Sequence, residues 1–402
     1  MLKKKLSYYT YALPTGADSL INVYAHGGET SVFNDFSLQH MPFPLRVTSK
    51  AVYGFVSPDD HMSGMTFTNP QDGKFFASLP TFVEVRFDYW NISPAVFKAE
   101  VNKSTRDWMF QHQASKVPAD VKSAIKDAVT QALRSKSAPA MRVVTASFDF
   151  SDHESPVLRV FTSSKSVANG VADFIGSCFG VEPVLVTFQH RCAKASWNCN
   201  GSALGHLSSA ATLASTHDNL HSLCMDTTVS QPWNSLRNDF GWWLMALSRA
   251  QNYPITIRHS ITQSAAEVYV GRLNSAQLVN NSVSVSAKGE VNEMDRHHLM
   301  AYTAINGLQF TVEVHATNDD GSTFSQVYAV KFAAGSDAVH VSEVPAKKPQ
   351  KQDAADGYRT YSVDVHEGMR GFENVFNSMI AEFLVCRTNT PVWDKTTMLD
   401  ID

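Results

Sequence analysis

Hydrophobic residues recur with a helical period between residues 92 and 136. Ser93 followed by Pro94 is typical of an N-cap and the first helical residue, so we expect a helix from there to about residue 112. The next segment, ADVKSAIKDAVTQALRSK, repeats apolar residues at alternating steps of three and one. It predicts a second helix, with a buried stripe made of Val121, Ala124, Ile125, Ala128, Val129, Ala132 and Leu133.

After Pro139 the period changes to two. The segments MRVVTASFDF and PVLRVF are typical of strands and are joined by the turn SDHES. A helix is expected over TSSKSVANGVADFIGSCFG, capped by Ser163 or Ser164 and ended by Gly180, and PVLVTF follows as a third strand. This order predicts an α+β fold with helices packed on mainly antiparallel sheets.

The C-terminal part repeats this mixture of periods. LRNDFGWWLMALSRA predicts a helix with Phe240, Trp243, Leu244 and Leu247 buried, whereas Trp242 lies off that stripe and suits an interface. Strands are expected at TIRHSI, AEVYVGRL, LQFTVEVHA and QVYAVKFA, with NDDGS as the turn of a hairpin. The last predicted helix, HEGMRGFENVFNSMIAEFL, buries Phe372, Val375, Phe376, Met379, Ile380 and Phe383.

Changes of composition suggest four regions. Residues 1–91 are expected to be β-rich and residues 92–190 to form a central domain of helix, helix, strand, strand, helix and strand. Residues 191–235 are expected to be a loop-rich insertion, because HRCAKASWNCNGSALGH at 190–206 is rich in Ser, Asn and Gly. Residues 236–402 are expected to form an α+β region that contains a linker at 344–357, VPAKKPQKQDAADG.

Overall composition narrows the class of protein. A chain of 402 residues with 44% hydrophobic content has enough apolar surface for a sizeable core. Its net charge of −4 argues against a protein whose whole surface binds nucleic acid. Binding through a confined basic face is compatible with this net charge. No apolar run approaches the ~20 residues of a membrane span, and the N-terminus lacks a signal peptide's apolar core of ~7–15 residues. We therefore expect a cytoplasmic protein.

The most conspicuous cluster of metal-ligand residue types lies in AKGEVNEMDRHHLM, residues 287–300. Glu293 and His297 have helical i,i+4 spacing, but the adjacent His297 and His298 point about 100° apart and do not converge on one ion. A turn followed by a helix start explains the segment better than a metal site. The five cysteines form no CxxC pair, and the gap between Cys192 and Cys199 suits no common zinc module, so reduced thiols and no cofactor are expected.

Evidence for catalysis is sparse. Glu84 and Asp88 lie on one face of the expected strand FVEVRFDYW, as in an acidic nuclease site, although a solvated strand face is the favoured interpretation. The sequence contains no GxSxG nucleophile motif and no glycine-rich phosphate loop. No catalytic residue is predicted.

Basic residues are the better candidates for a functional role. Each alone is typical of a solvated surface, and only several on one surface would bind phosphates together. The candidate DNA contacts are Lys98, Lys103, Arg106, Lys122, Lys126, Arg134, Lys136, Lys288, Lys347 and Lys348.

The order of several blocks resembles the recombination-associated protein RdgC family. The blocks are YGFVSP, VEVRFDYWNISPAVFKAEV, VKSAIKDAVTQAL and ASFDFSDHESPVLRVFTSSKSVANGVADFIGSCFGVEPV, followed by VSVSAKGEVNEMDRHHLMAYTAINGLQFTVEV, VYAVKF and YSVDVHEGMRGFENVFNSMIAEFL. They span residues from about 50 to 385, and it is the ordered set that resembles the family.

The resemblance implies a homodimeric ring that encircles duplex DNA without sequence preference, restrains RecA-type recombination and associates with the nucleoid. In the family a basic turn reaches DNA; here Lys288 keeps its charge, while Gly289 and Glu290 replace the next two residues. The segment RSKSAPAM lacks the aromatic residue that the family uses at a dimer contact. A DNA-processing nuclease and an oligomeric scaffold without nucleic acid are the alternatives.

Overall fold

The computed structural model describes residues 6–13, 45–56, 81–149, 156–198, 236–250, 255–258, 265–280, 283–288, 304–317, 321–333, 336–343 and 354–389. The chain divides into two compact units. Unit 1 contains residues 1–12, 161–168 and 184–402, and unit 2 contains residues 13–160 and 169–183. Both units combine helices with antiparallel strands, so the expected α+β class is confirmed.

The strands of unit 2 pair antiparallel in the order β2 (Ala51–Val56), β3 (Thr81–Tyr89), β4 (Ala140–Asp149) and β5 (Val157–Val160). One face of this sheet packs against α5 (Lys165–Phe179). Tyr53 and Phe55 contact Phe174, and Phe55 and Phe148 contact Phe179. The predicted strand pair and helix are confirmed. Gly180, at φ +67°, follows the end of α5, where a positive φ favours glycine.

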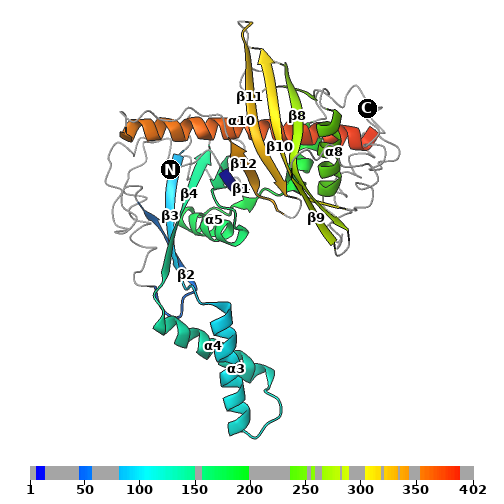
Figure 1. Ribbon diagram of the computed structural model, residues 1–402. Helices are drawn as coiled ribbons and strands as arrows, with labels where there is room; N and C mark the ends of the chain where they lie inside the picture. The colour runs from blue at the N-terminus through cyan, green and yellow to red at the C-terminus, as the bar shows by residue number, and fades with distance from the viewer. Residues whose placement is uncertain are drawn as a thin grey trace. The chain divides into compact units, whose positions relative to one another are not determined.

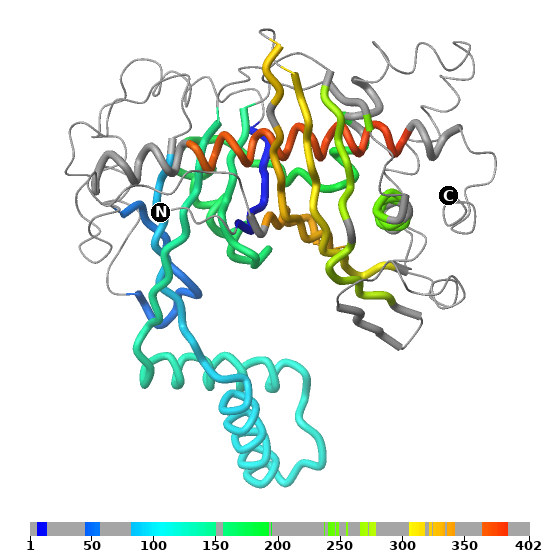
Figure 2. The backbone as a smooth tube through the Cα atoms, turned by 45° about the horizontal axis from the view of Figure 1, so that its top comes forward, coloured from blue at the N-terminus to red at the C-terminus, as the bar shows by residue number. Residues whose placement is uncertain are grey.

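Two helices connect β3 to β4, α3 (Pro94–Gln111) and α4 (Ala119–Lys136). They pack against each other as a helical hairpin that projects from the ends of these two strands (Figures 1 and 2). Ser93 is the N-cap of α3 and Pro94 is its first residue, as predicted. We refer to residues 94–136 as the helical hairpin.

Unit 1 is built on a second antiparallel sheet. Its strands follow the order β1 (Leu6–Ala12), β12 (Val339–Glu343), β11 (Thr323–Ala333), β10 (Ala304–Thr317), β8 (Ala265–Asn280) and β7 (Ile255–Arg258). Two shorter strands pair outside this order, β6 (Val184–Leu185) with β1 and β9 (Val283–Lys288) with β8. The predicted hairpin between LQFTVEVHA and QVYAVKFA is confirmed by the register of β10 and β11.

One face of the unit 1 sheet carries the core. Along β10, Phe310, Val312 and Val314 are buried, whereas Gln309 and His315 are exposed, as expected for an antiparallel sheet with one solvated face. The helices α8 (Leu236–Ala250) and α10 (Ala354–Asn389) belong to this unit, and α10 crosses the direction of its strands (Figure 1).

Phe240 on α8 is the aromatic centre of the unit 1 core. Its ring is fully buried, with neighbouring ring centroids at 5.3–5.7 Å. These rings belong to Phe188, Trp243, Phe332, Phe376 and Phe383. Because they come from three other elements, α6, β11 and α10, as well as from α8, the predicted apolar stripes of α8 and α10 meet at this point. Trp242, expected off the stripe of α8, is also buried.

Several expectations about local structure are wrong, including the third strand PVLVTF, of which only Val184–Leu185 forms a strand, β6. Part of the expected loop at 190–206 is helical, since α6 spans Phe188–Asn198. Phe188 and Cys192 are buried one turn apart, and Arg191 forms a buried ion pair with Glu373 of α10. An apolar stripe and one buried ion pair thus stabilise this helix, although the polar composition of the segment predicted a loop.

The helix α10 is longer than predicted and begins at Ala354, inside the expected linker 344–357. Residues 344–353, with Lys347 and Lys348, lie outside the described residues. Of the helices that the structure describes, none combines the length and hydrophobicity needed to cross a lipid bilayer.

The expected apolar stripe of α4 is only partly buried. Val129 is buried, whereas Ala124, Ala128 and Ala132 are exposed. Within the part of the chain that the structure describes, the main neighbour of α4 is α3, and the contact that α3 offers is narrower than the stripe. The two helices therefore bury only a narrow seam where they pack against each other.

Candidate nucleic-acid interface

The helical hairpin carries a charge opposite to that of the whole chain. Between Pro94 and Lys136 there are eight Lys and Arg residues and four Asp and Glu residues, a net charge of +4. Since the whole chain has a net charge of −4, the remaining residues carry −8. Seven of the ten predicted DNA contacts lie on this hairpin, which the sequence alone did not place on one projecting element.

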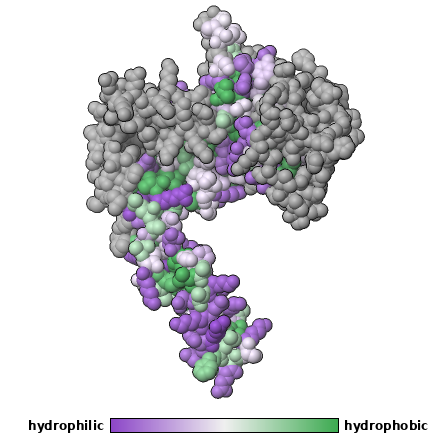
Figure 3. Space-filling model, viewed as in Figure 1, coloured by the Kyte–Doolittle hydropathy of each residue, from purple (hydrophilic) through white to green (hydrophobic). Residues whose placement is uncertain are grey.

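Most of these cations are exposed. On α3 the exposed ones are Lys98, Lys103 and Arg106, and on α4 they are Lys122, Lys126 and Lys136. Only Val101 and Val129 are buried in the two helices, so nearly all of the hairpin's surface faces solvent. Figure 3 shows this surface as predominantly hydrophilic, with smaller hydrophobic patches.

Arg134 differs from the other six predicted DNA contacts on the hairpin. Its Nη1 donates a hydrogen bond to the carbonyl oxygen of Val47 at 2.8 Å, and its side chain is half-buried. The guanidinium therefore holds the end of α4 to the segment before β2. Its charge contributes to the field of the hairpin, but its donors are partly used within the protein.

The other predicted contacts lie elsewhere. Lys288 is the last residue of β9 and pairs in register with Ser275 of β8, so it ends a strand of unit 1 instead of lying in a turn. The proposed helix start behind it, residues 289–300, lies outside the described residues, as do Lys347 and Lys348.

The tip of the hairpin is fixed by the way α3 ends. Ala114 N–H donates to the carbonyl oxygen of Met109 and Gln113 N–H donates to that of Phe110, which together form a Schellman motif. Gln113 occupies the left-handed position at φ 47°, where glycine is usual. The rings of His112 and Trp108 stack at 4.2 Å with an interplanar angle of 15°, which closes the last turn.

The sequence suggested that the acidic residues of β3 form a solvated face. The structure shows that they do not. Glu84, Arg86 and Asp88 share one face of the strand and are all buried. Both carboxylate oxygens of Asp88 accept hydrogen bonds from Arg86, at 2.9 Å each. Because this bidentate pair uses the metal-binding atoms of Asp88, it disfavours a two-carboxylate nuclease site here.

The same face continues onto β4 and β5 with a second buried pair. Arg159 donates to Asp149 at 2.9 Å, and Ser147 lies opposite Arg159 in the register of the two strands. The sequence carried a signal for the first pair, because Arg86 and Asp88 are two residues apart and residues i and i+2 of a strand share a face. It carried none for the second pair, because Arg159 and Asp149 lie on different strands.

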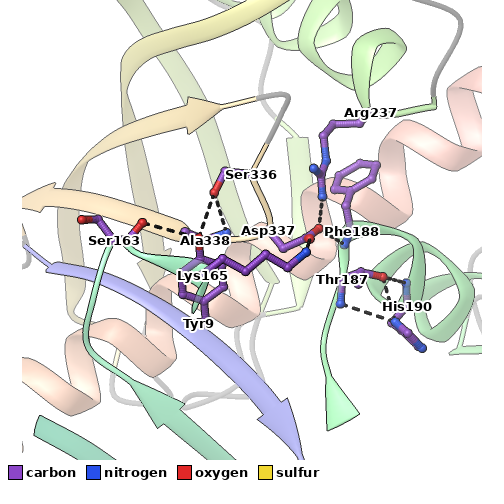
Figure 4. Close-up of polar contacts among 10 residues, drawn as sticks. All are labelled: Tyr9, Ser163, Lys165, Thr187, Phe188, His190, Arg237, Ser336, Asp337 and Ala338. Carbon is purple, nitrogen blue, oxygen red and sulfur yellow. Dashed lines mark hydrogen bonds and ion pairs between the residues drawn. The ribbon is translucent and has the colours of Figure 1, made fainter. Parts of the chain in front are cut away.

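Among the described residues of unit 1, a polar cluster surrounds Asp337, in the connection between β11 and β12 (Figure 4). Its carboxylate accepts from Arg237 of α8, from Lys165 at 3.2 Å and from the N–H of Phe188 at 3.4 Å. Burial alone would raise the pKa of Asp337, but the two cations outweigh burial and hold this pKa below its usual value. One carboxylate thus connects segments from four parts of the sequence.

A pocket of about 30 Å³ lies beside Asp337 and is lined by Arg191, Arg237, Lys331, His340 and the rings of Phe188 and Phe372. That volume corresponds to about one water molecule, too little for an organic substrate. The hydroxyl of Ser7 is hydrogen-bonded to His340 Nδ1 at 2.8 Å, and burial, together with the Lys331 cation, lowers the pKa of His340. The contacts around Asp337 join Lys165, α6 and α8 to the connection between β11 and β12.

Within the part of the chain that the structure describes, no three His, Cys, Asp or Glu side chains come together as a metal site. Cys178 and Cys192 are buried thiols that form no disulfide, and burial raises the pKa of Cys178 to about 12. No known family model matches the chain. No curated protein matches it either.

Proposed function

We propose that this chain is a sequence-independent DNA-binding protein and that the helical hairpin contacts the phosphate backbone. The observation that carries the proposal is the separation of charge, with +4 on an exposed pair of helices and −8 on the remaining residues. Cations held on a projecting element attract a polyanion, while the acidic remainder limits non-specific coating of the whole surface.

The finer features of the proposal rest on the resemblance in sequence. These are a ring-shaped homodimer around duplex DNA and the modulation of a RecA-type recombinase. In such a ring, the projecting helical hairpin would be suited to reach into the central hole or to close the ring. Lys288 is included as a contact on the same ground, because the family's corresponding turn reaches DNA.

The test is a titration of labelled duplex DNA by fluorescence anisotropy across a range of salt concentrations. Each phosphate contact contributes about −0.9 to the slope of log K against log salt. The double variant Lys122→Glu/Lys126→Glu should weaken binding uniformly across sequences and reduce the magnitude of the slope by about two. A wild-type affinity that is independent of salt would refute the proposal.

Lys194→Glu is the matched control. Lys194 is an exposed lysine on α6, outside the hairpin, and its substitution changes the net charge by the same amount per site. If this variant reduces the slope as much as each hairpin substitution does, the salt dependence reflects the net charge of the whole protein. It would then not identify a DNA-binding surface on α3 and α4.

The same titration separates binding from catalysis. DNA binding through cations should be indifferent to EDTA, whereas a nuclease would cleave labelled DNA when magnesium is present. Lys288→Glu tests the contact that rests on resemblance, since it should flatten the salt dependence only if β9 faces DNA.

A further inference from the structure

The outer face of α3 carries a row of exposed residues that its packing does not explain. Val96, Lys103, Arg106 and Phe110 are separated by seven, three and four residues, so they lie on one side of the helix. Val96 is 49% exposed and Phe110 is 87% exposed. The face that packs on α4 is a different one, since it includes the buried Val101.

Phe110 is the most exposed of the large apolar side chains that the structure describes. Among the described residues, its ring contacts no other aromatic ring, because the stack of Trp108 and His112 lies on the other side of the helix end. Covering a phenylalanine side chain is favourable by about 1.5–3 kcal/mol. A side chain left uncovered at the tip of a projecting element is therefore available for a ligand.

The neighbours of Phe110 indicate what that ligand is. Arg106 and Lys103 precede it by about one and two helical turns, about 6 Å and 10.5 Å along the axis. No ion pair joins either cation to another described residue. An exposed ring in line with two unpaired cations is the combination that binds single-stranded nucleic acid, with bases stacked on the ring and phosphates on the cations.

We infer that Phe110 stacks on an unpaired base and that the tip of the hairpin binds single-stranded or locally unpaired DNA. This inference rests on the proposed function and adds the form of DNA to it. In a duplex the base faces are already stacked on one another, so a protein ring reaches them only where pairing is absent. Stacking is also tolerant of sequence, because every base has a π-face, which agrees with sequence-independent binding.

The test compares Phe110→Leu with Phe110→Trp in binding to an oligothymidylate and to a blunt duplex of equal length. Leucine keeps an apolar side chain without a π-face, so the affinity for oligothymidylate should fall by about 5- to 100-fold while that for the duplex is unchanged. Tryptophan should keep or increase the affinity for oligothymidylate. Val96→Ala, in the same row but without a ring, is the matched control and should change neither affinity.

The results separate the inference from the proposed function. If wild-type protein binds duplex DNA with a steep salt dependence and Phe110→Leu has full affinity for oligothymidylate, the stacking inference fails and the proposed function stands. If wild-type protein binds neither DNA, both fail. If Phe110→Leu leaves DNA affinity intact but Phe110→Ala shifts the oligomeric state in light scattering, the ring contacts a second copy of the chain, and the inference is wrong.

Discussion

Asp337→Asn is the substitution for which the structure predicts the clearest effect on stability. The amide keeps the shape of the side chain but removes the charge that faces Arg237 and Lys165. The side chains of Asp337 and Arg237 are only 12% and 11% exposed, so the guanidinium would remain buried beside a neutral group. Breaking one partner out of a buried pair costs about 3–5 kcal/mol. Arg237 has further partners, including the ring of Phe188, so we expect the lower end, about 3 kcal/mol.

Hydrogen exchange followed by mass spectrometry is the suitable assay, because a chain with two compact units need not unfold in one step. Peptides from α8 should exchange about 100-fold faster in Asp337→Asn, which corresponds to about 3 kcal/mol. Lys165→Met is the control. Lys165 reaches the same carboxylate but is 55% exposed, so its loss should cost about 0–1 kcal/mol.

The pH dependence gives a second readout that needs no variant. The pKa of Asp337 is held below its usual value in the folded protein, so its contribution to stability is fully present above the ordinary aspartate pKa. That contribution is lost as the pH falls through the lowered pKa, and α8 should then lose protection. Equal exchange in wild-type protein and Asp337→Asn at neutral pH would refute the account of this cluster.

Two further predictions concern other parts of the molecule. Gln113→Gly should stabilise the end of α3 by up to about 1 kcal/mol, because glycine adopts a positive φ without steric cost. Slower hydrogen exchange of the hairpin's amides would show this stabilisation, and Gln113→Val should have the opposite effect. Burial and the Lys331 cation lower the pKa of His340, so its contribution to the free energy of unfolding is full above the ordinary histidine pKa and is lost as the pH falls through the lowered one. His340→Gln should remove this part of the pH dependence in exchange of β12, and an unchanged profile would contradict the assignment.

Local patterns predicted most of the individual elements. The helices α3 and α4 and the strand pair β4 and β5 follow from period and capping, because these signals lie within a few residues of one another. The pairing of β1 with β12 has no such signal, since Leu6 and Val341 come from opposite ends of the chain. The prediction of a loop at α6 failed for a related reason, because Arg191 is stabilised by Glu373 and not by its own segment.

The candidate interface was predictable residue by residue but not as a surface. Spacing identified Lys98, Lys103, Arg106 and the cations of α4, and it could not show that one projecting hairpin presents them. For the strand β3 the prediction was wrong. Its alternating charged residues suggested a face exposed to solvent, but Arg86 and Asp88 form a buried ion pair there. Charge on a strand is ambiguous until its neighbours are known, because a cation two residues from an acid can satisfy it internally.

The hairpin gains little stability from its own packing. Its two buried side chains, Val101 and Val129, contribute about 1.5–3 kcal/mol each, which is small beside the entropy of ordering two long helices. The ends of the hairpin supply the rest, through β3 and β4 at the base and the Schellman motif at the tip. A segment held at its ends leaves its faces free, so the exposed cations and Phe110 are available to a ligand at little cost to the fold. Charge-reversal and Phe110 variants should therefore change binding without changing stability, which makes them clean tests of function.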